Sequence, residues 1–167
     1  MNAAASFRKI ALIGFGLIGG SIARAAREQG LVEEIVTTAR SEKTRARVRE
    51  LGIVDAVVET NAEAVKDADL VILCIPVGAC GPVAEEIASV LRPGAIVSDV
   101  GSVKGAVVRE MAPYLPAGVH FVPAHPVAGT EHSGPDSGFA ELFINRWCIL
   151  TPPEGTDPGA VERLRVF

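Results

Sequence analysis

Two short segments of the chain carry the side chains best suited to chemistry. One is the stretch 98–104, SDVGSVK, with Ser102 and Lys104, and the other is the stretch 125–135, HPVAGTEHSGP, which begins at His125. Imidazole titrates near neutrality, so a histidine fixed by a following proline suits general acid–base catalysis. Lys104 could face an anionic substrate or only solvent. From position alone, a structural role for the histidine and an N-cap role for the serine are open alternatives.

The histidine and cysteine side chains, which commonly bind metal ions, do not show the spacing of a metal site. His120, His125 and His132 have no cysteine or carboxylate at ligand spacing, so we expect no metal site. The cysteines are odd in number and also lack such spacing; they are Cys74, Cys80 and Cys148. We expect them to be reduced, buried thiols of a cytoplasmic protein.

The glycine pattern G-x-G-x-x-G is formed by Gly14, Gly16 and Gly19. It follows the apolar run 10–13, which is typical of a buried parallel strand, and it opens a helix-like stretch that ends near Gly30. In dinucleotide-binding folds the first glycine allows a tight turn, the second lets the pyrophosphate approach the backbone, and the third lets the helix pack against the sheet. The helix start favours phosphate charge. This context predicts dinucleotide binding rather than a ligand-free glycine turn.

The end of the second expected strand bears on the choice between NAD and NADP. NAD-binding chains usually carry an acid there, which accepts hydrogen bonds from the adenine ribose. This chain has TTARS at 37–41 and no acid before Glu42. Arg40 could stack on adenine or pair with a 2′-phosphate, assisted by Ser41 and Arg45. The pattern favours NADP, with the alternative that the arginine is merely exposed and either cofactor binds.

Strand-like and helix-like segments alternate along the chain. The expected strands cover 10–13, 34–38, 56–58, 67–76, 95–98, 120–123 and 147–150, and the helices after the first cover 41–51, about 81–91, 103–111 and a stretch from about 158. The alternation predicts a Rossmann-type, doubly wound α/β fold over residues 1–167, with a mainly parallel sheet and helices on both faces. Both chemical segments then lie beyond carboxyl ends of strands, where ligands bind in such folds.

The expected cofactor contacts group at four strand ends. They are Gly14, Gly16, Leu17, Ile18 and Gly19 at the first; Arg40, Ser41 and Arg45 at the second; Cys74, Ile75 and Pro76 at the end of 67–76; and Ser102 after 95–98.

The composition of the chain limits the classes of partner that it can bind. The chain has 167 residues, 16 basic and 20 acidic side chains, and a net charge of -4, without a block of like charge. We therefore expect neither a nucleic-acid nor a membrane partner. The apolar stretch 70–84 is broken by prolines and glycines and is shorter than a membrane span. The mean hydropathy of +0.32 is high, which buried parallel strands and surface covered by another domain or subunit would explain.

Four motifs taken in order carry a family resemblance. GFGLIGGS, DADLVILCIP, DVGSVK and HPVAGTEHSGP resemble the nucleotide-binding half of prephenate dehydrogenases and of the related arogenate and cyclohexadienyl dehydrogenases. The resemblance implies oxidative decarboxylation of prephenate to 4-hydroxyphenylpyruvate, or of arogenate to tyrosine, in tyrosine biosynthesis. It implies that His125 bonds the ring hydroxyl and takes its proton as hydride leaves, that Ser102 helps to hold both, and that Thr130 and Glu131 line the substrate entrance.

The resemblance also implies a following helical domain that makes a homodimer and completes the substrate site. We expect this chain to lack that domain, and so to bind cofactor with little turnover. Lys104 and Arg146 are the local candidates for binding a substrate carboxylate. Two other readings stay open: a non-catalytic dinucleotide-binding module, and a related enzyme that oxidises a 3-hydroxy acid or reduces an imine.

Overall fold

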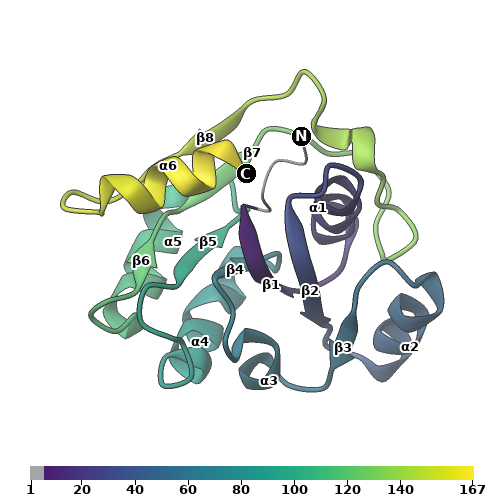
Figure 1. The fold of residues 1–167 in the computed structure, drawn as a ribbon, viewed down its shortest axis with the longest axis horizontal. Helices are drawn as coiled ribbons and strands as arrows, with labels where there is room; N and C mark the ends of the chain where they lie inside the picture. The colour runs from purple at the N-terminus through teal and green to yellow at the C-terminus, as the bar shows by residue number, and fades with distance from the viewer. Residues whose placement is uncertain (1–5) are drawn as a thin grey trace.

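A single parallel sheet organises the molecule. In the computed structural model, which describes residues 6–167, six strands lie in the order β3-β2-β1-β4-β5-β6, and every neighbouring pair is parallel (Figure 1). The strands are β1 (Phe7–Ile13), β2 (Val32–Thr38), β3 (Ala56–Val58), β4 (Leu70–Leu73), β5 (Ile96–Asp99) and β6 (His120–Phe121). This order is that of the dinucleotide-binding doubly wound fold, so the predicted fold class is confirmed.

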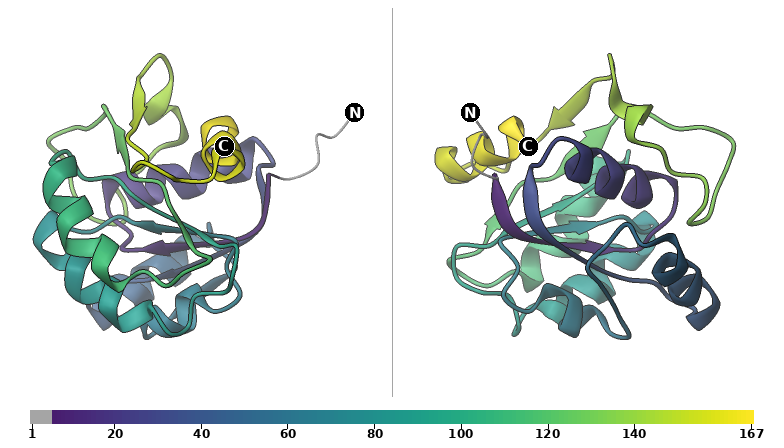
Figure 2. Two further views of the ribbon diagram at one scale, coloured as in Figure 1. Left: turned by 90° about the vertical axis from the view of Figure 1, so that its left-hand side faces the viewer. Right: turned by 45° about the vertical axis from the view of Figure 1, so that its right-hand side comes forward.

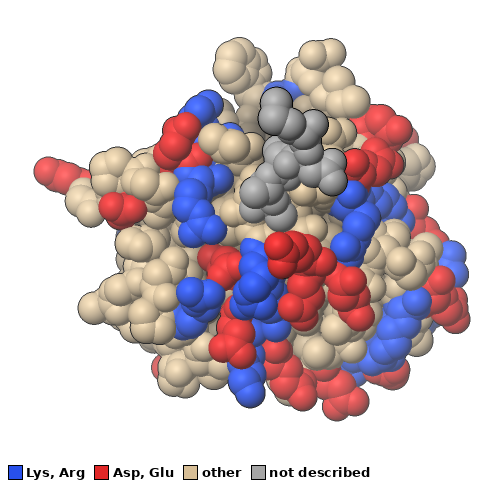
Figure 3. Space-filling view, in the orientation of Figure 1, with Lys and Arg blue, Asp and Glu red and all other residues tan. Residues whose placement is uncertain are grey.

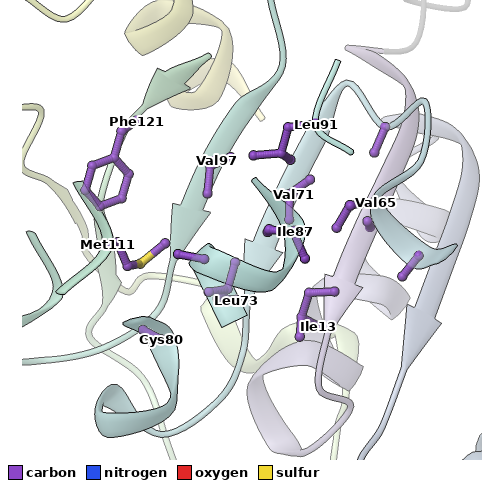
Figure 4. Packing of buried hydrophobic residues seen from close by; sticks show 14 of the residues in the cluster. Ile13, Val65, Val71, Leu73, Cys80, Ile87, Leu91, Val97, Met111 and Phe121 are labelled. Atoms are coloured by element: carbon purple, nitrogen blue, oxygen red, sulfur yellow. The ribbon is translucent and has the colours of Figure 1, made fainter. Parts of the chain in front are cut away.

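Helices cover both faces of the sheet (Figure 2). They are α1 (Leu17–Glu28), α2 (Glu42–Leu51), α3 (Asn61–Val65), α4 (Val77–Ile87), α5 (Lys104–Met111) and α6 (Pro158–Val166), with short 3-10 turns η1 (Ala112–Tyr114) and η2 (Ala140–Phe143). The cluster that includes α3, α4 and α5 packs on one face, where Ile13, Val71 and Leu73 point (Figure 4). The cluster that includes α1, α2 and α6 packs on the other face, onto Leu12 and Ile72. Because successive strand residues alternate between faces, strands buried on both sides read as unbroken apolar runs.

Helix ends follow the expected signals in part. Ser41 caps α2 by accepting a hydrogen bond from the Thr44 amide at 3.1 Å, and Gly52 ends that helix at a φ of 63°. Helix α3, whose capping box joins Thr60 and Glu63, was not predicted from the sequence. Helix α4 begins earlier than predicted, because Pro82 is typical of a helix start but lies inside this helix.

The last expected strands leave the main sheet. Residues 120–123 form only the two-residue β6, and the chain then enters β7 (Ala124–Pro126), which pairs antiparallel with β8 (Cys148–Leu150). This two-stranded ribbon is separate from the six-stranded sheet. The 147–150 segment is therefore a strand, as expected, but its partner is the segment that carries His125.

The surface and the thiols add three findings. On the face shown in Figure 3, acidic and basic side chains are interspersed instead of gathering by sign. No helix within residues 6–167 is long and apolar enough to cross a bilayer. The expectation that all cysteines are buried is wrong for Cys148, which is exposed because it lies on the outer ribbon, whereas Cys80 is buried and Cys74 half-buried.

Candidate functional site

In the glycine turn, which comprises residues 14–19, Gly14 and Gly19 have no room for a side chain. Gly14 has a φ of 93°, and a Cβ built there would lie 2.5 Å from the Cys74 carbonyl oxygen. A Cβ on Gly19 would lie 2.5 Å from the Gly14 carbonyl oxygen. The turn from β1 into α1 therefore packs directly against the end of β4, and glycine is required at both positions.

The start of α1 is arranged to receive an anion. A Cβ on Gly16 would meet no atom within 4 Å, so the space beside this backbone is open. Gly16 is the N-cap of α1; it makes no side-chain capping bond, and no acidic residue lies in the first turn. The first amides of this 12-residue helix can therefore donate to a pyrophosphate, and the residues fit the group that the sequence predicts.

The second strand end holds one free cation. Arg40 is exposed and has no carboxylate partner in the part of the chain that the structure describes. Arg45 instead donates to the Ala39 carbonyl at 2.7 Å and to Glu42 at 3.0 Å, and the Ser41 hydroxyl is occupied with Thr44. Of the three expected contacts here, Arg40 is therefore the one whose charge has no carboxylate partner among residues 6–167, and its cofactor contact stays a prediction.

The residues that follow β4 pack against the glycine turn. The β-carbon of Cys74 would lie 3.3 Å from a Cβ on Gly19, and the Ile75 side chain lies beside Gly14. Burial, followed by the nearby Asp99 carboxylate, raises the pKa of Cys74 to about 12, so this thiol is not a nucleophile at neutral pH. Pro76 is the exposed N-cap of α4.

The end of β5 contains a buried ion pair. Asp99, 1% exposed, accepts hydrogen bonds from Lys104 and, at 2.8 Å, from the Gly101 amide. Its other oxygen accepts from the Ala124 amide at 3.2 Å, and Lys104 donates to the Ala124 carbonyl at 2.7 Å. The ammonium of Lys104 thus has two protein partners, and its substrate contact stays a prediction. Ser102 is exposed, but the N-cap of α5 is Val103, so a capping role for the serine is wrong.

His125 lies in the middle of β7, opposite Ile149 of β8. The side chain is half-buried, and its imidazole has no hydrogen-bond partner among residues 6–167. Its neighbours Ala124 and Pro126 face an apolar cavity, so the alternation of a strand directs the imidazole to the opposite side of the ribbon. His125 is thus a free acid–base group one residue beyond the Asp99 contact.

The loop after β7 reaches back across the first two helices. Arg47 of α2 holds Asp136 through three hydrogen bonds of 2.6–3.1 Å, and the Phe139 amide donates to Ser21 of α1 at 3.0 Å. Thr130 and Glu131 are both exposed on this loop, and the Thr130 hydroxyl accepts from the His132 amide at 3.1 Å. The segment is therefore anchored at its far end, whereas its expected substrate residues face solvent.

Replacing Arg47 with alanine is expected to loosen this loop without unfolding the domain. Arg47 lowers the pKa of Asp136, so the link persists above the ordinary carboxyl range and is lost as the pH falls below about 4. Limited proteolysis of R47A should cut within 127–138 several-fold faster than in the native chain. R49A, which removes an arginine of the same helix that pairs with Glu42, is the control. Equal cutting in both variants would contradict the anchor.

A cavity of about 400 Å³ lies elsewhere, between α1, α6 and the ribbon. Its lining is mostly apolar and includes Phe143, Arg146, Trp147 and Phe167. The cavity is not lined by the residues expected to bind cofactor at 14–19 and at 40–45. Thr130 and Glu131 do not line it either. Arg146 lines this cavity, whereas the alternation of β7 directs the His125 side chain to the other side of the ribbon.

Asp99 was not among the site residues predicted from the sequence. The DVGSVK motif contained it, but the pairing with Lys104 and with the β7 backbone joins residues that lie 5 and 25 positions apart. In the described part of the chain, no three histidine, cysteine or carboxylate side chains come together as metal ligands.

The strand order, the glycine turn and the open helix start define a dinucleotide-binding domain of the Rossmann type. Comparison with known proteins gives the family. Residues 22–167 match the family described as prephenate dehydrogenase, nucleotide-binding domain, and the chain belongs to that family.

Relatives support the same assignment. The chain is 44% identical over 155 residues to a cyclohexadienyl dehydrogenase of Zymomonas mobilis, covering 93% of this chain and 53% of that protein. It is 37% identical over 157 residues to a prephenate dehydrogenase of Bacillus subtilis, covering 93% and 42%. The chain thus spans about half the length of the curated relatives it matches.

Solved structures share the fold. The prephenate dehydrogenase of Aquifex aeolicus, in complex with hydroxyphenyl propionate and NAD+, superposes with a TM-score of 0.86 at 30% identity, covering 95% of this chain and 55% of that one. The arogenate dehydrogenase of Synechocystis also superposes with a TM-score of 0.86, at 34% identity, with the same coverage.

Proposed function

We propose that this chain binds a nicotinamide dinucleotide along the carboxyl ends of β1, β2, β4 and β5. The pyrophosphate would bind at Gly16 and the first turn of α1, with Gly14, Leu17, Ile18 and Gly19 around it. The adenine ribose would lie at Arg40, and the nicotinamide near Cys74, Ile75, Pro76 and Ser102. The open space beside Gly16 and the uncapped helix start support this placement.

We propose that the whole enzyme oxidatively decarboxylates prephenate to 4-hydroxyphenylpyruvate, or arogenate to tyrosine. When bound, the nicotinamide supplies the hydride acceptor. His125 would accept the proton of the ring hydroxyl, and Ser102 would help to orient that hydroxyl. Loss of carbon dioxide makes the ring aromatic and drives the reaction, so the protein mainly has to orient the reacting carbon.

The observation that carries this proposal is the position of His125 in β7, in a chain that belongs to the prephenate dehydrogenase family. Its imidazole has no hydrogen bond to residues 6–167, and the preceding residue, Ala124, donates its amide to Asp99 at the end of β5, near which the nicotinamide would lie. Thr130, Glu131 and Lys104 complete the proposed substrate contacts. A homodimer and a cytoplasmic location belong to the same proposal.

The test joins residues 1–167 to the remaining half of the Zymomonas cyclohexadienyl dehydrogenase, because the chain covers 53% of that relative. The chimaera should reduce the dinucleotide with prephenate or with arogenate, and the ratio of the two rates decides the substrate. The 167-residue chain alone should bind cofactor with little turnover. A chimaera that folds and binds cofactor but oxidises neither substrate would overturn the proposal.

The cofactor preference rests on Arg40. We propose that NADP binds at least as tightly as NAD, because Arg40 can pair with the 2′-phosphate while Arg45 is occupied. Arg40→Asp should weaken NADP binding by about tenfold to a hundredfold, the worth of a charge-assisted hydrogen bond, and leave NAD binding unchanged or tighter. Titration calorimetry of the 167-residue chain measures both.

Arg109→Asp makes the same change of charge on α5, across the sheet from α2, and should alter neither affinity. If both cofactors bind with equal affinity and Arg40→Asp changes neither affinity, Arg40 does not bind the 2′-phosphate.

A further inference from the structure

We propose that Asp99 and Lys104 are positioning residues that fix the backbone of His125 by holding the peptide groups of Ala124. This inference rests on the proposed function, in which His125 accepts the substrate proton. It gives the buried ion pair at the end of β5 a part in the reaction that does not depend on the substrate contact proposed for Lys104.

The ion pair holds both polar backbone groups of one residue. The Ala124 amide donates to Asp99 at 3.2 Å, and the Ala124 carbonyl accepts from Lys104 at 2.7 Å. That carbonyl belongs to the peptide bond whose nitrogen is part of His125. The two peptide planes on either side of Ala124 are therefore fixed, which leaves the chain little freedom where it enters His125.

The opposite edge of β7 is held by β8. The Val127 amide donates to the Trp147 carbonyl at 2.8 Å, and the Thr151 amide donates to the Pro123 carbonyl at 2.9 Å. Backbone groups of successive strand residues point to opposite edges, so those of Ala124 point away from β8. Asp99 and Lys104 bond the edge of β7 that faces away from β8, so both edges of the strand that carries His125 are hydrogen-bonded.

Burial gives this arrangement its rigidity. Asp99 is 1% exposed, and its three donors are Lys104 and the amides of Gly101 and Ala124. A buried carboxylate without its cation is strongly unfavourable, so Lys104 is held in place by the same charge that it neutralises. The pair joins three segments that the sequence separates: the end of β5, the first turn of α5 and the strand of His125.

The experiment compares three variants of the 167-residue chain by NMR. K104M removes the donor to the Ala124 carbonyl. D99N/K104M removes both charges and so avoids the unpaired buried carboxylate that the single variant leaves. V107A, the control, truncates a buried side chain of the same helix and leaves the charges of Asp99 and Lys104 in place. The readouts are the Ala124 carbonyl carbon, the His125 amide nitrogen and imidazole signals, and hydrogen exchange at Ala124.

In K104M and D99N/K104M we expect Ala124 exchange to rise by about tenfold relative to the Val122 amide, which bonds to Val97 in the main sheet, and the His125 signals to move. V107A should leave that exchange ratio and those signals in place. K104R, which keeps a donor, should restore part of the native pattern. Native His125 signals in D99N/K104M, or the same changes in V107A, would overturn the proposal.

In the chimaera, K104M should lower kcat by about tenfold to a hundredfold while the KM for dinucleotide stays unchanged, as expected for a misplaced acid–base group. An unchanged kcat would overturn the positioning role. A chimaera with native Lys104 but no turnover would overturn the proposed function instead; the exchange experiment would still decide whether the pair fixes the His125 backbone.

Discussion

His125→Asn is expected to lower prephenate oxidation by the chimaera by about 10²- to 10⁴-fold, the usual contribution of a general acid–base group. Asparagine keeps the approximate size of the side chain but cannot accept a proton. The variant should bind NAD and NADP as the native protein does, because His125 lies in β7 and outside the glycine turn. Steady-state rates together with cofactor titration of the 167-residue chain measure the two effects separately.

His120→Asn is the matched control for this variant. His120 lies in β6, five residues earlier, and is also half-buried. The control should keep most of the activity. Full activity in His125→Asn, or an equal loss in both variants, would mean that His125 has a structural role and that another group takes the proton.

Gly16→Ala should separate cofactor binding from folding. A methyl group at Gly16 meets no protein atom within 4 Å and φ is -97°, so the free energy of unfolding should change by less than about 1 kcal/mol, the usual range for an N-cap exchange. The same methyl group would occupy the space of the pyrophosphate. We expect binding of both dinucleotides to weaken by at least about a hundredfold, since the close backbone approach is lost.

Gly14→Ala gives the opposite result and serves as its contrast. The new Cβ would lie 2.5 Å from the Cys74 carbonyl oxygen in a backbone with a φ of 93°. The strain should lower the free energy of unfolding by about 1–3 kcal/mol or more, measured by denaturant titration. Undiminished cofactor binding by a folded Gly16→Ala variant would show that the pyrophosphate does not bind at this turn.

The parts of the fold that local patterns encode could be read from the sequence. The apolar run before Gly14 and the alternation of strands with helices predicted the Rossmann-type, mainly parallel sheet, because each element carries its own period and stop signals. The helix α3 was missed although Thr60 and Glu63 form a capping box, since five residues are too few for a periodic pattern to show.

The parts that depend on distant contacts could not be read in this way. The ribbon pairs His125 with Ile149 across a long loop, and antiparallel pairing over that distance leaves no local signal. The same holds for Lys104, whose partners are a strand end and the backbone of Ala124. The residue types around the site could be predicted, whereas the contacts of Lys104 with Asp99 and Ala124 needed coordinates.

The ribbon also sets an order for the maturation of the protein on the ribosome. All six strands of the main sheet are complete once Phe121 has been made, so the nucleotide-binding surface can form early. The strand that bears His125 obtains its partner only after Cys148–Leu150 has emerged. A nascent chain can therefore form the carboxyl-end edge of its parallel sheet before the strand of the group proposed for proton transfer has found its partner.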